Sequence, residues 1–114
     1  MTGDCLQVTT TTESEADARR LARAAVEARL AACVQVVGPI ESTYWWKGRL
    51  EQAREWMCLA KTTSDAYPAL ESFLLANHPY DTPEITACVL DRGSDSYLSW
   101  IREETRGSPD EGLV

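Results

Sequence analysis

The stretch that decides the fold spans residues 33–62 and reads CVQVVGPIESTYWWKGRLEQAREWMCLAKT. β-Branched and aromatic residues dominate it, and Lys47-Gly48 divides it into two halves. Because glycine accepts the positive φ of a two-residue hairpin turn, the stretch predicts two antiparallel strands, 33–46 and 49–62. Pairing outward from the turn gives three cross-strand pairs, which are Trp46 with Arg49, Trp45 with Leu50 and Tyr44 with Glu51. Gly38-Pro39 predicts a bulge, because proline has no N–H to donate to the ladder.

The length of this hairpin indicates self-association. Strands of this length extend about 45 Å at about 3.3 Å per residue. A compact chain of 114 residues has a radius of gyration near ~13 Å and is roughly 34 Å across. The tip therefore overhangs its own domain, and its open strand edges need cover from another chain. The alternative is a tip that folds back over its own core.

The aromatic side chains divide into two predicted groups. Large aromatics in a small domain are typical of cores and interfaces, although together they can also line a ligand pocket. We assign the hairpin group to an interface between copies of the chain, namely Tyr44, Trp45, Trp46 and Trp56. Tyr80 and Trp100 are assigned to the lining of a cleft, and a pocket between subunits stays open as a hypothesis.

The flanking segments complete an α+β fold. A strand is expected at 4–11 and a helix at 15–31, capped by Ser14 and carrying an apolar face of Leu21, Ala25, Val26 and Leu30. A second helix begins at Ser64 or Asp65 with a buried stripe of Leu70, Phe73 and Leu74, and ends at His78-Pro79. Next we expect a strand within 84–91. It is followed by a helix at about 95–105 that turns Tyr97, Leu98 and Ile101 inward. The order βαββαβ plus a C-terminal helix predicts a ferredoxin-like sheet with both helices on one face. We expect a single domain at 1–106 and a flexible tail at 107–114.

Charge and composition exclude several classes of partner. The chain carries 18 acidic and 11 basic side chains, a net charge of −7, which disfavours nucleic acid and anionic membranes. No apolar run approaches the ~20 residues that span a bilayer, and the N-terminal residues lack the pattern of a signal peptide, so a cytoplasmic location is expected. The four cysteines form no CxxC pair, which favours buried, unreactive thiols.

Residues 78–85, HPYDTPEI, contain the only histidine and are the main candidate site. One interpretation is an open site for copper or zinc, with His78, Asp81 and Glu84 as ligands. Another is acid/base chemistry by the carboxylates. A third is a rigid corner in which His78 complements a helix C-terminus. No nucleophile elbow, P-loop, dinucleotide fingerprint or HExxH motif is present, so we expect a protein that is not an enzyme.

Three separated motifs resemble the CutA family of divalent-cation tolerance proteins. They are RLAACVQVVGPIESTYWWKGRLEQAREWMCLAKT, YPALESFLLANHPYDTPEI and YLSWI, in matching order and spacing over about residues 5–105. The resemblance implies a ferredoxin-like protomer in a homotrimer, with the long hairpin strands joining sheets between subunits. It also implies a role in tolerance to copper or other divalent metals. The CutA trimer is similar to that of the PII signalling proteins, so a regulatory role is a second expectation.

The metal ligands of the family match this sequence only in part. Copper-binding bacterial members carry a cysteine at the position of Thr10 and a histidine pair at Asn77 and His78, of which this chain retains only His78. Loss of the thiolate removes the softest ligand, which matters most for Cu(I). Two functions are therefore carried forward: a cytoplasmic, homotrimeric metal-binding protein of copper or divalent-cation tolerance, and a PII-like small-molecule-sensing or scaffold trimer without a true metal site.

Overall fold

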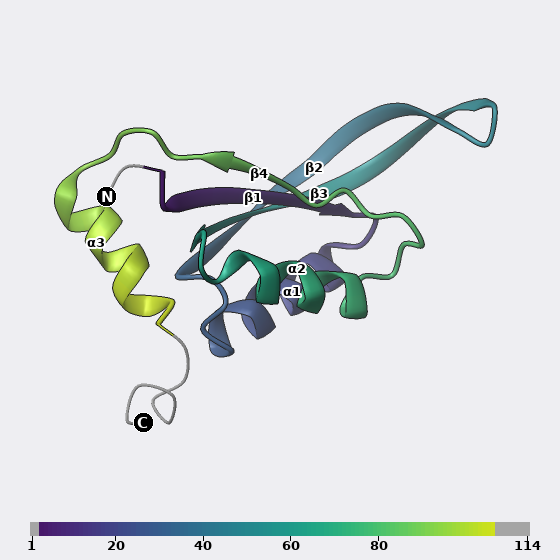
Figure 1. Ribbon diagram of the computed structural model, residues 1–114. Coiled ribbons are helices and arrows are strands. Elements are labelled where there is room, and N and C mark those ends of the chain that lie inside the picture. Colours follow the sequence, from purple (N-terminus) through teal and green to yellow (C-terminus); the bar gives the residue numbers. More distant parts are fainter. Residues whose placement is uncertain (1–2, 107–114) are drawn as a thin grey trace.

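A computed structural model describes residues 3–106, and the predicted tail at 107–114 lies outside the described residues. The described elements are, in order, β1 (Cys5–Thr12), α1 (Glu15–Glu27), β2 (Cys33–Trp46), β3 (Arg49–Thr63), α2 (Tyr67–Asn77), β4 (Thr86–Val89) and α3 (Asp95–Glu104) (Figure 1). The strands form one antiparallel sheet in the order β2-β3-β1-β4. The predicted mixed α+β class and the order of the elements are confirmed.

The hairpin of β2 and β3 has the predicted register. Tyr44 pairs with Glu51, and the two pairs nearer the turn also match. Lys47 and Gly48 both have positive φ, 51° and 79°, as a two-residue turn requires. The register shifts between Val37 and Ile40, where the bulge was expected. Residue 38 is glycine for a steric reason, because a Cβ there would lie 2.5 Å from a ring atom of Trp56.

The tip of the hairpin overhangs the rest of the chain, as predicted. Figure 1 shows β2 and β3 continuing well past the helices, and the principal extents are 49 × 29 × 21 Å. The radius of gyration is 15.0 Å, against about 13 Å for a compact chain of this size. Within the single chain, Trp45 and Leu50 are 73% and 62% exposed. Two large apolar side chains that pair across the hairpin are thus left in contact with solvent.

Helices α1 and α2 lie on the same face of the sheet and bury the core against it (Figure 1). Val8 from β1, Leu21 from α1, and Leu70 and Leu74 from α2 form its centre. A second, smaller cluster joins Ile101 of α3 to the start of β1. None of the helices within residues 3–106 has the length and apolar character needed to cross a membrane.

Several expected helix features were wrong. The first helix ends at Glu27 rather than at 31, because Arg29 adopts a left-handed φ of 63°. The second helix begins after Ala66, whose N–H is accepted by the hydroxyl of Thr63, so neither Ser64 nor Asp65 is its cap. Val26 and Tyr97, predicted to face inward, are 38% and 41% exposed. Periodicity places a residue on a face of a helix but does not show how far the neighbouring element reaches over it.

The thiols are only partly buried. Cys5 and Cys58 are buried as expected, and desolvation raises the pKa of Cys58 to about 11. Cys33 is half-buried and Cys88 is exposed in the single chain, so the expectation of uniformly buried thiols was wrong. Cys88 lies in β4, an edge strand whose four residues are all exposed.

The hydrogen-bonded ion pair between Asp4 and Arg102 leads to the first prediction. Arg102 donates from Nε to Oδ2 of Asp4 at 2.6 Å and from Nη2 to Oδ1 at 3.0 Å, which fastens α3 to the start of β1. This bonding lowers the pKa of Asp4 below its ordinary value of 3.8. A carboxyl with a lowered folded-state pKa stabilises the fold above its unfolded pKa and loses that contribution as the pH falls through the folded value.

The free energy of unfolding, measured with denaturant from about pH 5 down to about pH 2.5, should therefore fall more steeply for the wild type than for Asp4→Asn. Asp65→Asn, at an exposed turn position, is the matched control and should keep the wild-type pH dependence. Parallel curves for the wild type and Asp4→Asn would contradict the assigned role of this pair.

Candidate functional site

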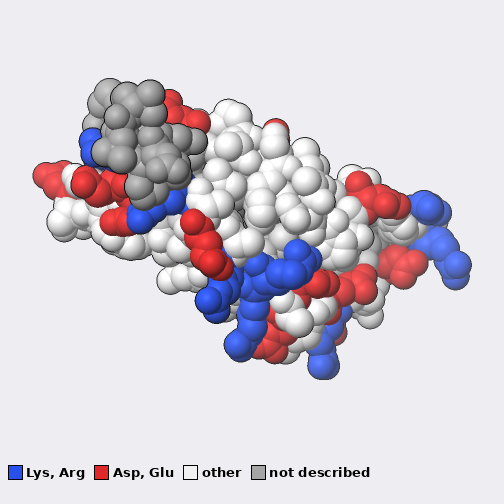
Figure 2. Space-filling view, turned by 90° about the horizontal axis from the view of Figure 1, so that it is seen from below, with Lys and Arg blue, Asp and Glu red and all other residues white. Residues whose placement is uncertain are grey.

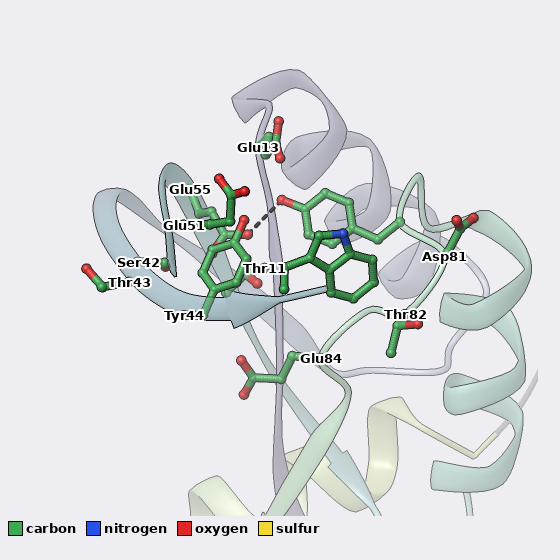
Figure 3. Close-up of a pocket in the computed structure, with 12 residues that line it drawn as sticks. Thr11, Glu13, Ser42, Thr43, Tyr44, Glu51, Glu55, Asp81, Thr82 and Glu84 are labelled. Carbon is green, nitrogen blue, oxygen red and sulfur yellow. Dashed lines mark hydrogen bonds between the residues drawn. The ribbon is translucent and has the colours of Figure 1, made fainter. Parts of the chain in front are cut away.

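A pocket of about 700 Å³ lies beside the outer half of the hairpin. Three separate parts of the chain line it: the end of β1, the facing sides of β2 and β3, and the loop that leads from α2 toward β4 (Figure 3). The loop at 80–84 faces the two strands across this pocket.

The lining of this pocket is acidic and partly aromatic. Five lining residues carry carboxylates, and the described lining includes no lysine, arginine or histidine. Two phenols and an indole add aromatic surface. The complete lining is Thr11, Glu13, Ser42, Thr43, Tyr44, Trp46, Glu51, Glu55, Tyr80, Asp81, Thr82 and Glu84. Such a surface attracts cations and repels anions.

Glu55 and Tyr80 form a partly buried hydrogen bond in the lining of the pocket. The Tyr80 hydroxyl donates to Oε2 of Glu55 at 2.6 Å, and Glu55 is only 6% exposed. Among the described residues, Glu55 has no lysine, arginine or histidine within salt-bridge distance. Burial, followed by the bond to Glu55, raises the pKa of Tyr80, so the phenol stays protonated and remains a donor. The buried carboxylate thus has one neutral hydrogen-bond partner and no cationic partner.

The neighbouring phenol experiences the same negative field. Tyr44 has a raised pKa, first because of desolvation and then because of the charges of Glu55, Glu13 and Glu51. Trp46 already has a cation nearby, since Nζ of Lys47 lies 5.7 Å from its ring centroid. An ammonium group at that distance from an indole is within the range of cation–π attraction.

His78 holds the loop that carries Tyr80. Its Nδ1 accepts the backbone N–H of Tyr80 at 3.1 Å, so its Nε2 carries the proton and donates to the carbonyl oxygen of Thr11 at 2.8 Å. The side chain is buried and neutral, and burial lowers its pKa below the ordinary 6.5. The ring also contacts the ring of Tyr80 at 4.8 Å between centroids. His78 therefore fastens the end of α2 to the end of β1 and positions one wall of the pocket.

Only two of the three predicted metal ligands line the pocket. Asp81 and Glu84 line the pocket, whereas His78 lies beneath it with both ring nitrogens hydrogen-bonded. Among residues 3–106, no group of three or more His, Cys, Asp or Glu side chains is placed to hold a metal ion. Thr10 is 2% exposed and its hydroxyl has no hydrogen-bond partner in the described part of the chain, while the amide of Asn77 donates to the carbonyl oxygen of Phe73. The assignment of a metal to these residues stays a prediction.

Only some of the aromatic residues predicted to form an interface or a cleft line the pocket. Tyr44, Trp46 and Tyr80 line the pocket of the single chain. Trp45 is the most exposed of the set at 73%. The remaining two, Trp56 and Trp100, do not line the pocket: Trp56 packs against the bulge at residue 38, and Trp100 on α3 contacts Tyr97.

Sequence reasoning missed Thr11, Glu13, Glu51 and Glu55, together with the smaller lining residues. Glu51 could have been identified from the sequence, because the register predicted from the turn already placed it opposite Tyr44. Glu55 lies beyond the bulge, where it pairs with Ile40, so its face was not determined by counting from the turn. Thr11 reaches the pocket only through the packing of β1 beside β3.

The outer face of the molecule differs from the pocket. Figure 2, seen from below, shows acidic and basic side chains next to one another, with no broad patch of one sign on this face. On α1 they form ion pairs between Arg19 and Glu15 and between Arg23 and Glu27. Exposed pairs of this kind contribute little to stability. The mixed charge of this face contrasts with the lining of the pocket, in which the described charged side chains are all acidic.

Comparisons with known proteins agree with the fold. The family described as "CutA1 divalent ion tolerance protein" matches residues 6–104. The divalent-cation tolerance protein CutA of Thermus thermophilus is 45% identical over 83% of this chain and 92% of its own length. Human Protein CutA is 41% identical over 91% of this chain, which spans 58% of the human protein. The crystal structure of CutA1 from Shewanella sp. SIB1 is 36% identical in sequence. Its superposition on this chain has a TM-score of 0.89 and covers 94% of this chain and 100% of the Shewanella chain.

The relatives are described from different compartments. The structure from Archaeoglobus fulgidus is described as a periplasmic divalent cation tolerance protein, and a relative from Arabidopsis thaliana is described as chloroplastic. The family therefore does not determine the location of this chain.

Proposed function

The chain belongs to the CutA1 divalent ion tolerance family, and from that premise we propose that it acts in metal tolerance as a homotrimer that binds a cation in its acidic pocket. The observation that carries the proposal is the pocket itself, because its described lining holds five carboxylates and no basic side chain. Members of the family are named for tolerance and not for a reaction, so we propose a binding role rather than catalysis. A cytoplasmic location stays a prediction.

The homotrimer is supported by the surfaces that a single chain leaves uncovered. Trp45 and Leu50 are exposed at the hairpin, and β2 and β4 are the two open edges of the sheet. Open edges and large apolar patches are covered in most soluble proteins, commonly by another copy. The order of the strands and the position of α1 and α2 on one face support the proposal of a ferredoxin-like protomer. We therefore propose that the hairpins of three such protomers extend one another's sheets.

Copper, or another divalent metal, is the first proposed ligand. Asp81 and Glu84 offer oxygen ligands at the wall of the pocket. His78 can join them only if its ring releases the carbonyl of Thr11 or the N–H of Tyr80. Metal binding by this set therefore requires the loop at 80–84 to rearrange around the ion.

Calorimetric titration with Cu²⁺ and with Zn²⁺ tests this site. We expect His78→Ala, and the double variant Asp81→Asn with Glu84→Gln, to weaken binding at least about tenfold, because a lost ligand affects affinity at least as much as a lost outer-shell contact. Glu103→Gln removes an exposed carboxylate outside the pocket and should bind as the wild type does. Identical heats for all four proteins would refute a metal site at these residues.

The second candidate function is a PII-like trimer that senses a small molecule or acts as a scaffold without a true metal site. Two observations favour it: the pocket is large enough for an organic molecule, and the described residues gather no metal-holding group. A sensor of this kind should melt at a higher temperature with its ligand bound, since a ligand that binds only the folded state stabilises it.

A further inference from the structure

The carboxylate of Glu55 is buried, and among the described residues no basic side chain lies within salt-bridge distance of it. Glu55 is 6% exposed and lines the pocket, and the only hydrogen bond that its carboxylate receives within the described residues comes from the neutral phenol of Tyr80. Burying an ionised carboxylate is costly unless it is paired and hydrogen-bonded. The second carboxylate oxygen is therefore available to a donor that enters from the pocket.

A second buried polar group supports the same conclusion. Thr11 is 7% exposed and lines the pocket, and its hydroxyl has no hydrogen-bond partner among the described residues but is not sealed off from the pocket. Figure 3 shows its side chain in the middle of the lining. An unpaired hydroxyl that opens into a cavity can accept a hydrogen bond from water or from a bound donor. Thr11 and Glu55 come from adjacent strands, and both offer acceptors to one ligand.

The distribution of the carboxylates selects an extended ligand over a bare metal ion. Glu13, Glu51, Asp81 and Glu84 surround the pocket from β1, the hairpin and the loop (Figure 3). They do not gather into a group of three that could coordinate one ion within residues 3–106. Separated negative charges around one cavity match a molecule with separated positive charges.

The aromatic walls indicate that the charges are carried by an organic chain. Tyr44 and Trp46 line the pocket, and they are 38% and 42% exposed in the single chain. Aromatic faces pack against methylene groups and attract ammonium groups. A hydrated metal ion gains nothing from either ring, whereas an alkylammonium gains from both.

We propose that this pocket binds an aliphatic diamine or polyamine, with one ammonium group donating to Glu55 and Thr11, the methylene chain against Tyr44 and Trp46, and a second ammonium group at the outer carboxylates. The inference goes beyond the role in metal tolerance, and it holds whether or not the chain also binds a metal. Anionic metabolites and nucleotides are excluded from the same space by the five carboxylates.

Calorimetric titration of the full chain with 1,4-diaminobutane and with spermidine, in a buffer containing a chelator, tests the proposal independently of any metal. We expect a Kd below about 1 mM, tighter for spermidine, and weaker binding when the NaCl concentration is raised, because salt screens the attraction. The neutral isostere 1,4-butanediol should give no binding heat. No heat with either amine, or equal binding of the diol, would overturn the proposal.

The variants locate the site. Glu55→Gln keeps an acceptor for the Tyr80 hydroxyl but removes the charge, and we expect it to weaken diamine binding at least about tenfold. Glu51→Gln, at a half-exposed position, should weaken diamine binding by a smaller factor and serves as the test if Glu55→Gln fails to fold. Glu103→Gln removes the same charge outside the pocket and should stay within about twofold of the wild type. If Glu103→Gln weakens binding as much as the pocket variants do, the amines bind the net charge of the protein and the proposal is wrong.

Discussion

His78→Ala is expected to lower the free energy of unfolding by about 3 kcal/mol at neutral pH. The side chain is 9% exposed and joins two segments that are 67 residues apart in sequence. Its removal leaves the carbonyl of Thr11 and the N–H of Tyr80 without their partner, and it also leaves a cavity under the loop. Denaturant unfolding at a fixed protein concentration measures the loss, since the stability of a self-associating protein depends on concentration.

The same residue gives the stability a pH dependence with a definite sign. Burial is the main cause that lowers the pKa of His78, partly opposed by the bond to Thr11 and the charges of Asp17 and Glu55, while Arg20 lowers it further. The neutral form is therefore the stabilising one. Its contribution is complete above the ordinary pKa of 6.5 and is lost as the pH falls through the lowered folded-state value. From about pH 7.5 to about pH 5, the wild type should lose more stability than His78→Ala.

Asn77→Ala provides the matched control for this position. Asn77 is adjacent and exposed, and its amide only contacts the carbonyl of Phe73 within its own helix. The change should cost less than about 1 kcal/mol and leave the pH dependence unaltered. A loss for His78→Ala no larger than that of Asn77→Ala would mean that His78 does not fasten the loop.

Trp45→Asp combined with Leu50→Asp is expected to convert the proposed homotrimer to single chains. The two residues pair across the hairpin and are 73% and 62% exposed within one chain. If they are buried between copies, the variant places two carboxylates in an apolar interface, where an unpaired charge carries a penalty of several kcal/mol. Sedimentation velocity at micromolar concentration should show the wild type at three times the mass of the chain and the variant at one.

Leu75→Asp is the control for this experiment. Leu75 lies on α2 and is 57% exposed, close to the exposure of Leu50, but it is not part of the hairpin. Its replacement should leave the mass unchanged. A wild-type protein that sediments as a folded single chain would refute the homotrimer, and loss of the trimer in Leu75→Asp alone would place the interface on the helices.

The candidate site was only half predictable from the sequence. Tyr80 and Asp81 were identified because they lie within two residues of a proline, and Tyr44 because it lies three residues before the turn signal, where local chemistry restricts the backbone. Glu55 and Thr11 gave no such signal. They face the pocket because a bulge shifts the register of β2 against β3, and because β1 packs between β3 and β4. A rigid corner was one of three interpretations of His78, and the acceptor that it bonds, the carbonyl of Thr11, belongs to a distant strand.

The sequence by itself determined the features that depend on local interactions. The turn at Lys47-Gly48, the register of the hairpin around it and the cap of α1 at Ser14 each follow from a few adjacent residues. Even the overhang followed from counting residues along extended strands. Only the tertiary structure decided how deeply each side chain is buried and which carboxylates share a pocket. These properties depend on the packing of segments far apart in the chain, because burial and charge clustering are set by neighbours in space rather than in sequence.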